Sequence, residues 1–282
     1  MGRRALVFCC LVALAAGAAG CGGSDGSSSV ATTPAQVANG PVAATAAPVR
    51  VAPSHAAVPV LMYHVIAAAP PGAKYSGLWV PPALLRAQVA ALAGAGFTGV
   101  TLDTVLDAWR GRARLPAHPV VLSFDDGYLS QGKDAGAILA AARWPGVLNL
   151  AWHNLGVPGG LTRTRVKELV GAGWEVDAHS LTHPDLTTID AAALKREVAG
   201  SRDAIRRAFG VPVDAFCYPA GKYDAAVEAA VRAAGYRAAT TEVPGAARPG
   251  GDRLALPRIR VNATDSAATV VHNVQAALVS AS

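Results

Sequence analysis

The regular alternation of strand-like and helix-like segments constrains this chain most. From about residue 56 onward, short apolar runs alternate with segments whose apolar residues recur at helical spacing. Strands joined through helices in this way run parallel, and the helices cover the sheet. The sequence therefore predicts a single α/β domain over residues 56–282. The predicted strands are 58–63, 97–102, 120–124, 147–152, 174–178, 215–218, 236–240 and 254–261; the predicted helices are 81–93, 103–109, 131–142, 162–172, 190–209, 224–234 and one from 266.

The composition is that of a folded domain with an ordinary surface. Of the 282 residues, 52% are hydrophobic and 16% are charged, which suffices to bury a full core. The formal net charge of +6 includes Arg3 and Arg4 close to the amino terminus. Lysine and arginine form no stripe interleaved with aromatic residues, so we expect no binding to nucleic acid.

The amino-terminal residues have the pattern of an export signal. Residues 1–20 carry Arg3 and Arg4 before a short apolar stretch and small residues, as in a secretory signal peptide. The sequence Ala-Ala-Gly-Cys that ends at Cys21 resembles a bacterial lipobox, although Ala18 stands where leucine is usual. We therefore expect a lipid on Cys21 that holds the protein at a membrane. The alternative is plain secretion with cleavage near the same place.

A polar segment separates this signal from the predicted domain. Residues 21–55 are rich in glycine, serine, threonine, alanine and proline and show no apolar periodicity, which predicts a flexible linker. Beyond Cys21 the sequence contains one further cysteine, Cys217, so no disulfide is expected within the domain. We expect an exported monomer that is lipid-anchored to the outer face of the bacterial cell membrane or otherwise extracellular.

Two carboxylates and two imidazoles directly follow predicted strands. Asp125 and Asp126 end one strand, and His179 and His183 come after another. In parallel α/β folds the active residues gather at the carboxyl ends of strands. One aspartate and two histidines form a common hydrolytic metal site with an open position for water. The second aspartate is then free to take a proton from that water.

Each motif also has a plain structural interpretation. An Asp-Asp-Gly sequence after a strand is often only a turn, and the two histidines could be a helix cap and a surface residue. The spacing of His179 and His183 lets both imidazoles face one point if residues 180–183 form a helical turn. Taken together, the two motifs predict a metal-dependent hydrolase.

The motifs resemble those of the polysaccharide deacetylases of carbohydrate esterase family four. Residues 123–127 (SFDDG) are similar to the family's Thr/Ser-Phe-Asp-Asp-Gly, and residues 179–183 (HSLTH) to its His-Ser/Thr-x-x-His. The resemblance covers roughly residues 58–261. It implies an irregular (β/α) barrel of the deacetylase type.

The resemblance also implies roles for these residues. Asp125 corresponds to the general base, and Asp126, His179 and His183 correspond to the ligands of a divalent metal. Two imidazoles and a carboxylate suit Zn²⁺, and Co²⁺ or Ni²⁺ also fits.

A third family motif departs from its usual form in this chain. Residues 216–221 (FCYPAG) correspond to Arg-x-Pro-Tyr-Gly or Tyr-Pro-Tyr-Gly. Ala220 stands where the family has a tyrosine whose backbone N–H binds the oxyanion, and a backbone donor survives a change of side chain. Cys217 stands where the family has an arginine that orients the base. Arg258 is the candidate replacement; the alternative is a surface or core-edge arginine.

His64 resembles the general acid of the family. The sequence Leu-Met-Tyr-His that ends at His64 is similar to the Leu-x-His motif, which normally lies near the carboxyl terminus. This order is similar to that of the circularly permuted branch that acts on exported poly-N-acetylglucosamine. The alternative is a histidine at the edge of the core that bonds a carbonyl.

The sequence therefore predicts a hydrolase that removes N-acetyl groups from a polysaccharide of the cell envelope or the extracellular space. The expected partner is an acetylated glycan of the N-acetylglucosamine type: a secreted poly-N-acetylglucosamine, peptidoglycan or a chitin-like chain. An O-acetyl esterase is the nearest alternative. An inactive, surface-tethered glycan-binding lipoprotein is another. No Gly-x-Ser-x-Gly elbow lies between a predicted strand and helix, because residues 22–26 (GGSDG) fall in the predicted linker, and this argues against a serine esterase.

Overall fold

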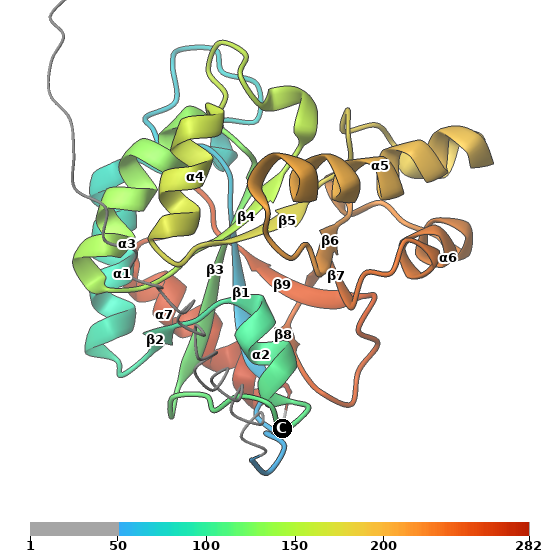
Figure 1. Cartoon of the computed structure of the whole chain (residues 1–282). Helices are drawn as coiled ribbons and strands as arrows, with labels where there is room; N and C mark the ends of the chain where they lie inside the picture. Colours follow the sequence, from blue (N-terminus) through green and yellow to red (C-terminus); the bar gives the residue numbers. More distant parts are fainter. Residues whose placement is uncertain (1–50, 282) are drawn as a thin grey trace, which may run out of the picture. The chain divides into compact units, whose positions relative to one another are not determined.

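Seven parallel strands close into a barrel (Figure 1). A computed structural model describes residues 51–281, and a compact unit, Ala47–Ser282, holds the barrel. Around the barrel the strand order is β3, β4, β5, β6, β7, β9, β1, and the pairing of β1 with β3 closes the ring. The predicted α/β fold is confirmed, in the barrel form that the resemblance implied. The strands are β1 (Val58–Tyr63), β2 (Thr98–Gly99), β3 (Pro119–Asp126), β4 (Val147–Leu150), β5 (Glu175–Ala178), β6 (Ala215–Cys217), β7 (Ala238–Pro244), β8 (Ala246–Ala247) and β9 (Leu256–Arg260).

Seven α-helices accompany the strands within residues 51–281. They are α1 (Pro82–Gly94), α2 (Leu102–Ala108), α3 (Gly136–Ala142), α4 (Arg163–Gly171), α5 (Ala191–Phe209), α6 (Ala225–Ala233) and α7 (Ala267–Val279). Capping residues explain where several of these helices begin and end. The side chain of Asp190 accepts a hydrogen bond from the N–H of Ala193 at the start of α5, and Gly210 ends the helix in the left-handed conformation (φ 68°).

One predicted strand is mostly wrong. Residues 97–102 were expected to form a strand, but β2 ends at Gly99. The Thr101 side chain accepts a hydrogen bond from the N–H of Thr104 at 3.2 Å and caps α2, which therefore begins at Leu102. A local cap thus outweighs the β propensity of the apolar residues around it.

The barrel interior is mainly apolar near the amino ends of the strands, apart from the acidic group described below, and polar towards their carboxyl ends. Val58, Val121 and Val147, near the amino ends of their strands, form one buried cluster with Val105 and Leu106 of α2. Helix α2 therefore closes this end of the barrel (Figure 1). Towards the carboxyl ends of the strands, buried polar residues replace the apolar ones; they are Ser123, Asp125, Asn149, Cys217 and Arg258.

The predicted leader, Cys21 and most of the predicted linker lie outside the described residues. The described chain begins against the end of α2, where the N–H of Val51 donates to the carbonyl of Gly111 at 3.0 Å. A Cβ on Gly111 would lie 2.4 Å from the carbonyl oxygen of Val51, and Gly111 has φ 70°, so this contact requires glycine. Among residues 51–281, no helix combines the length and the apolar character needed to cross a bilayer.

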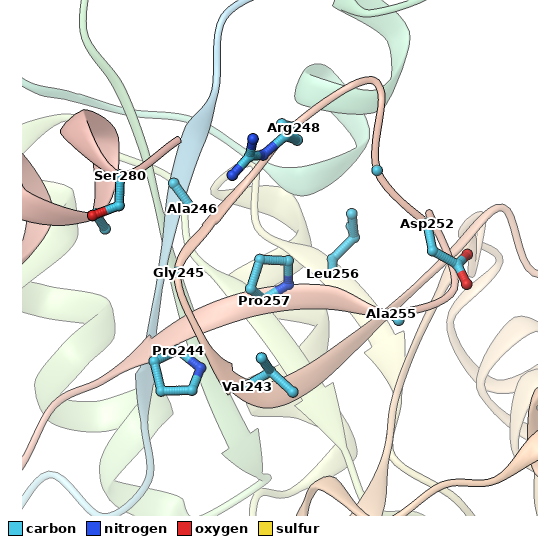
Figure 2. A pocket seen from close by; sticks show the side chains of 12 residues that line it. Val243, Pro244, Gly245, Ala246, Arg248, Asp252, Ala255, Leu256, Pro257 and Ser280 are labelled. Carbon is cyan, nitrogen blue, oxygen red and sulfur yellow. The ribbon is translucent and has the colours of Figure 1, made fainter. Parts of the chain in front are cut away.

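A hollow of about 340 Å³ lies beside β8 and the start of β9 (Figure 2). Val243 and Pro257 form part of its wall, and Arg248 and Ser280 lie at its edge. Its wall combines the carboxyl end of β7, at Val243, with the amino end of β9, at Pro257, so the hollow lies on the side of the barrel.

Acidic side chains gather where α2 meets the barrel. The N–H of Asp103 donates to Glu175 Oε2 at 2.8 Å, and the Asp103 carboxylate lies 3.6 Å from Arg237. Burial, followed by the charges of Asp177 and Asp214, raises the pKa of Asp103 to about 7. Arg237 therefore offsets only part of the cost of ionising Asp103 in the folded protein.

This pKa predicts a pH dependence of stability. The unfolded chain releases the Asp103 proton near pH 4, whereas the folded chain keeps it until about pH 7, so stability is lost as the pH rises between these values. Asp103→Asn should reduce the fall in unfolding free energy between pH 5 and pH 8 by about 2 kcal/mol. Urea melts at the two pH values measure it. The exposed Asp203→Asn serves as control, and an unchanged slope in Asp103→Asn would contradict the assignment.

Candidate active site

The two aspartates at the end of β3 diverge because the backbone turns sharply there. Asp126 has φ 81° and Gly127 has φ 90°. A Cβ on Gly127 would lie 2.5 Å from Leu150 Cδ1, so the turn needs glycine at this position. Asp125 is consequently buried inside the barrel, while the Asp126 side chain stays 14% exposed at its mouth.

Asp126, His179 and His183 lie together as predicted from the sequence. Asp126 Oδ1 is 3.5 Å from the Nε2 atoms of both histidines. Ligand atoms about 2.1 Å from one tetrahedral cation lie about 3.4 Å apart, which is close to these two separations. The Nδ1 of His179 is 2.7 Å from the carbonyl oxygen of Cys217, so this ring is held with Nε2 towards Asp126. The three side chains therefore fit a divalent cation.

The two imidazoles converge although residues 180–183 do not form the helical turn that would also have brought them together. Ser180 and His183 both adopt left-handed conformations (φ 63° and 57°), and the segment forms a bend. The N–H of His183 donates to Ser180 Oγ at 2.9 Å. Glu197 of α5 holds the middle of the bend by accepting from the N–H groups of Leu181 and Thr182, at 2.8 and 2.9 Å.

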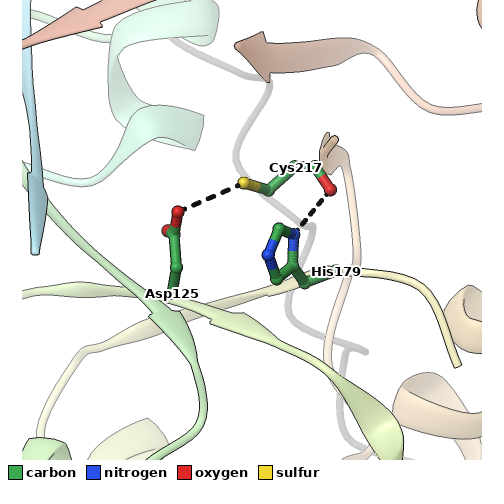
Figure 3. A group of neighbouring side chains, drawn as sticks. All are labelled: Asp125, His179 and Cys217. Atoms are coloured by element: carbon green, nitrogen blue, oxygen red, sulfur yellow. Dashed lines mark hydrogen bonds between the residues drawn. The ribbon is translucent and has the colours of Figure 1, made fainter. Parts of the chain in front are cut away.

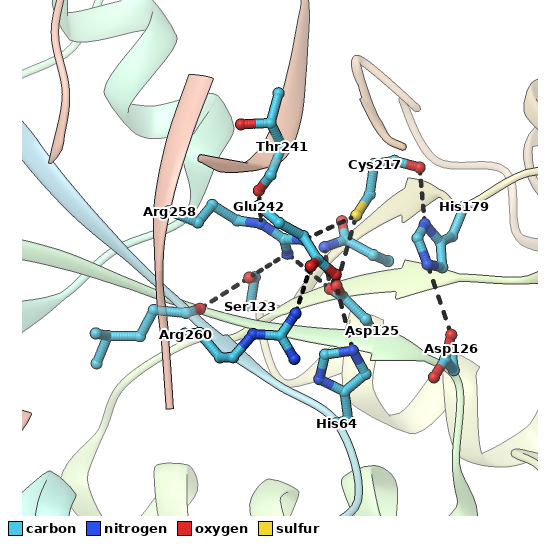
Figure 4. A network of polar contacts seen from close by, with 12 residues as sticks. His64, Ser123, Asp125, Asp126, His179, Cys217, Thr241, Glu242, Arg258 and Arg260 are labelled. Atoms are coloured by element: carbon cyan, nitrogen blue, oxygen red, sulfur yellow. Dashed lines mark hydrogen bonds and ion pairs between the residues drawn. The ribbon is translucent and has the colours of Figure 1, made fainter. Parts of the chain in front are cut away.

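Arg258 lies inside the barrel and pairs with Asp125 (Figure 4). Its Nη1 donates to Asp125 Oδ1 and its Nη2 to Oδ2, both at 2.8 Å. Its Nε donates to the carbonyl of Thr241 at 2.8 Å, and Nη1 also reaches Ser123 Oγ at 3.1 Å. Arg258 is therefore neither a surface nor a core-edge arginine. It approaches the carboxylate from β9, whereas the family motif places its arginine at the position of Cys217.

The environment of Asp125 keeps it ionised. Burial raises its pKa, but the charge and hydrogen bonds of Arg258 outweigh burial and hold the pKa well below its usual range. Asn149 Nδ2 also donates to Oδ1 at 2.7 Å. Oδ1 thus accepts from Arg258 and Asn149, and Oδ2, which accepts from Arg258 and the Cys217 thiol, faces His64.

His64 follows β1 and lies beside this carboxylate, with Nε2 4.0 Å from Asp125 Oδ2. Its Nδ1 is buried and has no hydrogen-bond partner within residues 51–281, so its ring does not bond a carbonyl. Burial lowers the pKa of His64, and the charges of Asp125 and Asp126 oppose this effect. The structure thus brings His64 next to the residue that the resemblance identifies as the base.

Cys217 belongs to a second group that could hold a metal, with Asp125 and His179 (Figure 3). Its Sγ lies 3.6 Å from Asp125 Oδ2 and accepts from Arg258 Nη2 at 3.2 Å. Burial raises the pKa of the Cys217 thiol well above its ordinary value, and metal binding requires the thiolate. Because Asp125 is also taken by Arg258, the group around Asp126 is the better cation site.

Ala220 lies in a short 3-10 turn, Pro219–Gly221, directly after β6. It has φ 51° and is solvent-exposed, so the turn presents backbone near the mouth of the barrel. A Cβ on Gly221 would lie 2.7 Å from Glu242 Cγ, which places this turn against the end of β7.

Sequence reasoning missed two polar residues that support the site. Asn149 bonds Asp125 directly, and Gln131 Nε2 donates to the carbonyls of both His64 and Asp125. Asn149 could have been found as the polar residue in an otherwise apolar strand. Gln131 lies outside any motif and gave no such signal.

Comparison with known proteins finds similarity over a part of the chain that contains several residues of the candidate site. A family model described as polysaccharide deacetylase matches residues 112–239, which contain the aspartates of β3 and both histidines but neither His64 nor Arg258. The Bacillus subtilis (strain 168) protein YxkH, whose name assigns it provisionally to the polysaccharide deacetylases, is 26% identical over 207 residues. That alignment covers 73% of this chain and 72% of YxkH.

Solved structures show the same fold. A polysaccharide deacetylase of Bacillus cereus superposes with a TM-score of 0.70 at 28% identity, covering 78% of this chain and 69% of that one. The deacetylase PplD of Streptococcus pyogenes, solved with acetate, gives 0.73 at 24% identity and covers 78% and 99%. IcaB of Ammonifex degensii gives 0.66 at 23% identity and covers 79% and 98%. The chain is thus similar to polysaccharide deacetylases both in sequence and in fold.

Proposed function

We propose that the protein is a metal-dependent deacetylase that removes N-acetyl groups from a glycan of the N-acetylglucosamine type. The observation that carries the proposal is the position of Asp126 Oδ1, 3.5 Å from both imidazole Nε2 atoms, beside a second, ionised aspartate. Asp126, His179 and His183 would hold the cation. When bound there, a divalent metal such as Zn²⁺, Co²⁺ or Ni²⁺ supplies Lewis-acid polarisation and acidifies a ligated water.

The remaining residues handle protons and position the acetyl group. Asp125 accepts the proton of the attacking water on Oδ2, the oxygen that faces His64. His64 donates a proton to the leaving amine of the sugar. The backbone N–H of Ala220 donates to the oxyanion. Arg258 and Asn149 fix the plane of the Asp125 carboxylate and thereby hold Oδ2 on the side of His64.

The bond to Arg258 makes Asp125 a weak base. A carboxylate whose pKa is held far below its usual range accepts a proton only from a strongly acidified water. Because Arg258 lowers the pKa of Asp125, the activity depends on how acidic the attacking water is. For the same reason, Asp125 stays ionised throughout the physiological range. We therefore expect no loss of activity from protonation of Asp125 in mildly acidic solution.

We also propose that the protein works outside the cytoplasm. The signal-like residues 1–20 and the lipobox-like sequence at Cys21 support export and a lipid anchor on the outer face of the cell membrane. The substrate would then be a glycan of the envelope or of the extracellular matrix.

The direct test of the activity is acetate release from acetylated glycans with and without a chelator. N-acetylglucosamine oligomers, peptidoglycan fragments and an O-acetylated xylan cover the amide and ester alternatives. We expect release from an N-acetylated substrate, its loss with chelator, and its return with Zn²⁺, Co²⁺ or Ni²⁺. Release only from the ester would replace the amidase by the esterase, and no release from any substrate would favour a binding protein.

Substitutions separate the base from the ligands. Asp125→Asn should reduce turnover by about 10²- to 10⁴-fold, because an amide cannot take the proton, while metal content is kept. His179→Ala should lose both turnover and metal. Metal content by mass spectrometry after dialysis, and acetate release, measure these effects, with the exposed Asp203→Asn as control. Wild-type turnover in Asp125→Asn would refute the assignment of the base.

We expect Arg258 both to stabilise the fold and to orient the Asp125 carboxylate. Arg258→Met leaves the Asp125 carboxylate buried without a cation, which should cost about 3–5 kcal/mol of unfolding free energy. The double variant Asp125→Asn with Arg258→Met should recover most of that loss in urea melts. Arg258→Lys, which keeps the charge but not the paired hydrogen bonds, should fold and show a lower kcat with little change in KM. A wild-type kcat in Arg258→Lys would show that Arg258 has no positioning role.

A further inference from the structure

A group of arginines lies at the amino end of the barrel, opposite the candidate active site. We call this surface the basic face, and its exposed members are Arg110, Arg112, Arg232, Arg248 and Arg253. A hollow of about 390 Å³ lies within it, lined by Arg110, Arg232, Arg237 and Arg253 together with Asp252. It is distinct from the neighbouring hollow of Figure 2, although both share Asp252.

The arginines of the hollow differ in how their charges are balanced. Arg237 pairs with carboxylates of α2 and of Asp214, and Arg232 pairs with Glu228. Arg110 and Arg253 form no ion pair within residues 51–281. Burial and the like charges of nearby arginines, Arg237 and Arg253 first, lower the pKa of Arg110. Asp252 also lines the hollow and the charge of Asp107 acts on Arg110, so the unpaired Arg110 and Arg253 leave a partial excess of positive charge there.

Two exposed valines lie at or next to the hollow of Figure 2, which adjoins the basic face at Asp252. Val243 is 53% exposed and lines the hollow of Figure 2 with Arg248 and Ser280. Val279, next to Ser280 at the end of α7, is 77% exposed. Arginines beside exposed apolar residues are typical of surfaces that lie at a lipid interface, because the guanidinium groups bind phosphates while the apolar groups leave water.

The upstream end of the described chain lies at this surface. The N–H of Val51 bonds Gly111, the residue after Arg110, so the upstream residues join the domain at the basic face. Asp126, His179 and His183 lie at the carboxyl ends of the strands, at the other end of the barrel. A tether on the upstream residues would thus reach the domain from the side of the basic face, while the predicted flexible linker leaves the orientation of the domain to other contacts.

We propose that the basic face binds the phosphate headgroups of an anionic membrane, with the active-site mouth directed away from the bilayer. The exposed valines favour a lipid surface over a soluble phosphate polymer, which offers no apolar phase for them. This binding adds to any lipid on the chain and does not depend on the deacetylase chemistry.

The test uses residues 47–282, the compact unit, so that no lipid or signal sequence contributes to binding. Sedimentation with vesicles of phosphatidylglycerol and phosphatidylcholine should show binding that weakens as salt rises, and pure phosphatidylcholine vesicles should bind little. Arg110→Gln with Arg253→Gln should lower the partition coefficient about 25-fold, at about fivefold per arginine. Acetate release in solution should be unchanged in that variant.

A matched variant separates a specific face from net charge. Lys195→Gln with Arg196→Gln removes the same charge from the exposed surface of α5 and should leave vesicle binding within about twofold. Equal losses in both double variants, or no binding to phosphatidylglycerol at all, would overturn the proposal. Binding to a soluble poly(glycerol phosphate) without binding to vesicles would overturn the membrane assignment and identify a polymer ligand instead.

Discussion

The buried pair of Asp125 and Arg258 is the interaction on which the rest of the site depends. A carboxylate that is 1% exposed is tolerable inside a barrel only with a cation and further donors around it. Arg258 supplies both oxygens of Asp125 with hydrogen bonds and also bonds Ser123 and the carbonyl of Thr241. The pair thereby joins β3, β7 and β9 in the polar half of the interior. The pair also makes Asp125 a weaker base, because Arg258 stabilises the ionised carboxylate and so lowers its affinity for a proton.

The sequence was sufficient for the architecture and for the cluster of Asp126, His179 and His183. Strand and helix periods identified most elements, since caps such as Asp190 and Gly210 are local signals. The position of Arg258 could not be derived, because it depends on β1 lying between β9 and β3 in the closed barrel. The bend at His179–His183 was also beyond local rules: two left-handed residues are stabilised there by Glu197, a residue of a distant helix.

Backbone strain is concentrated at the mouth of the barrel. Within residues 51–281, six residues other than glycine have positive φ, and four of them lie at the candidate site: Asp126, Ser180, His183 and Ala220. Such conformations cost about 1–3 kcal/mol each and persist only where surrounding contacts impose them. Here the contacts come from the strand ends and from Glu197 of α5, so the geometry of the cation site is set before any ligand arrives.

The place of β1 in the ring has a consequence for how the molecule forms. This first strand of the domain pairs with β3 on one side and with β9 on the other, where Leu61 lies opposite Ile259. The pairing of β1 with β9 joins residues that are separated by nearly the whole length of the unit. Such a pairing forms slowly, because the intervening chain must lose entropy before the contact can stabilise the closed ring. The ring therefore stays open until the last strand has left the ribosome. Since His64 follows β1 and Arg258 lies on β9, the competent pocket is one of the last features of the molecule to assemble.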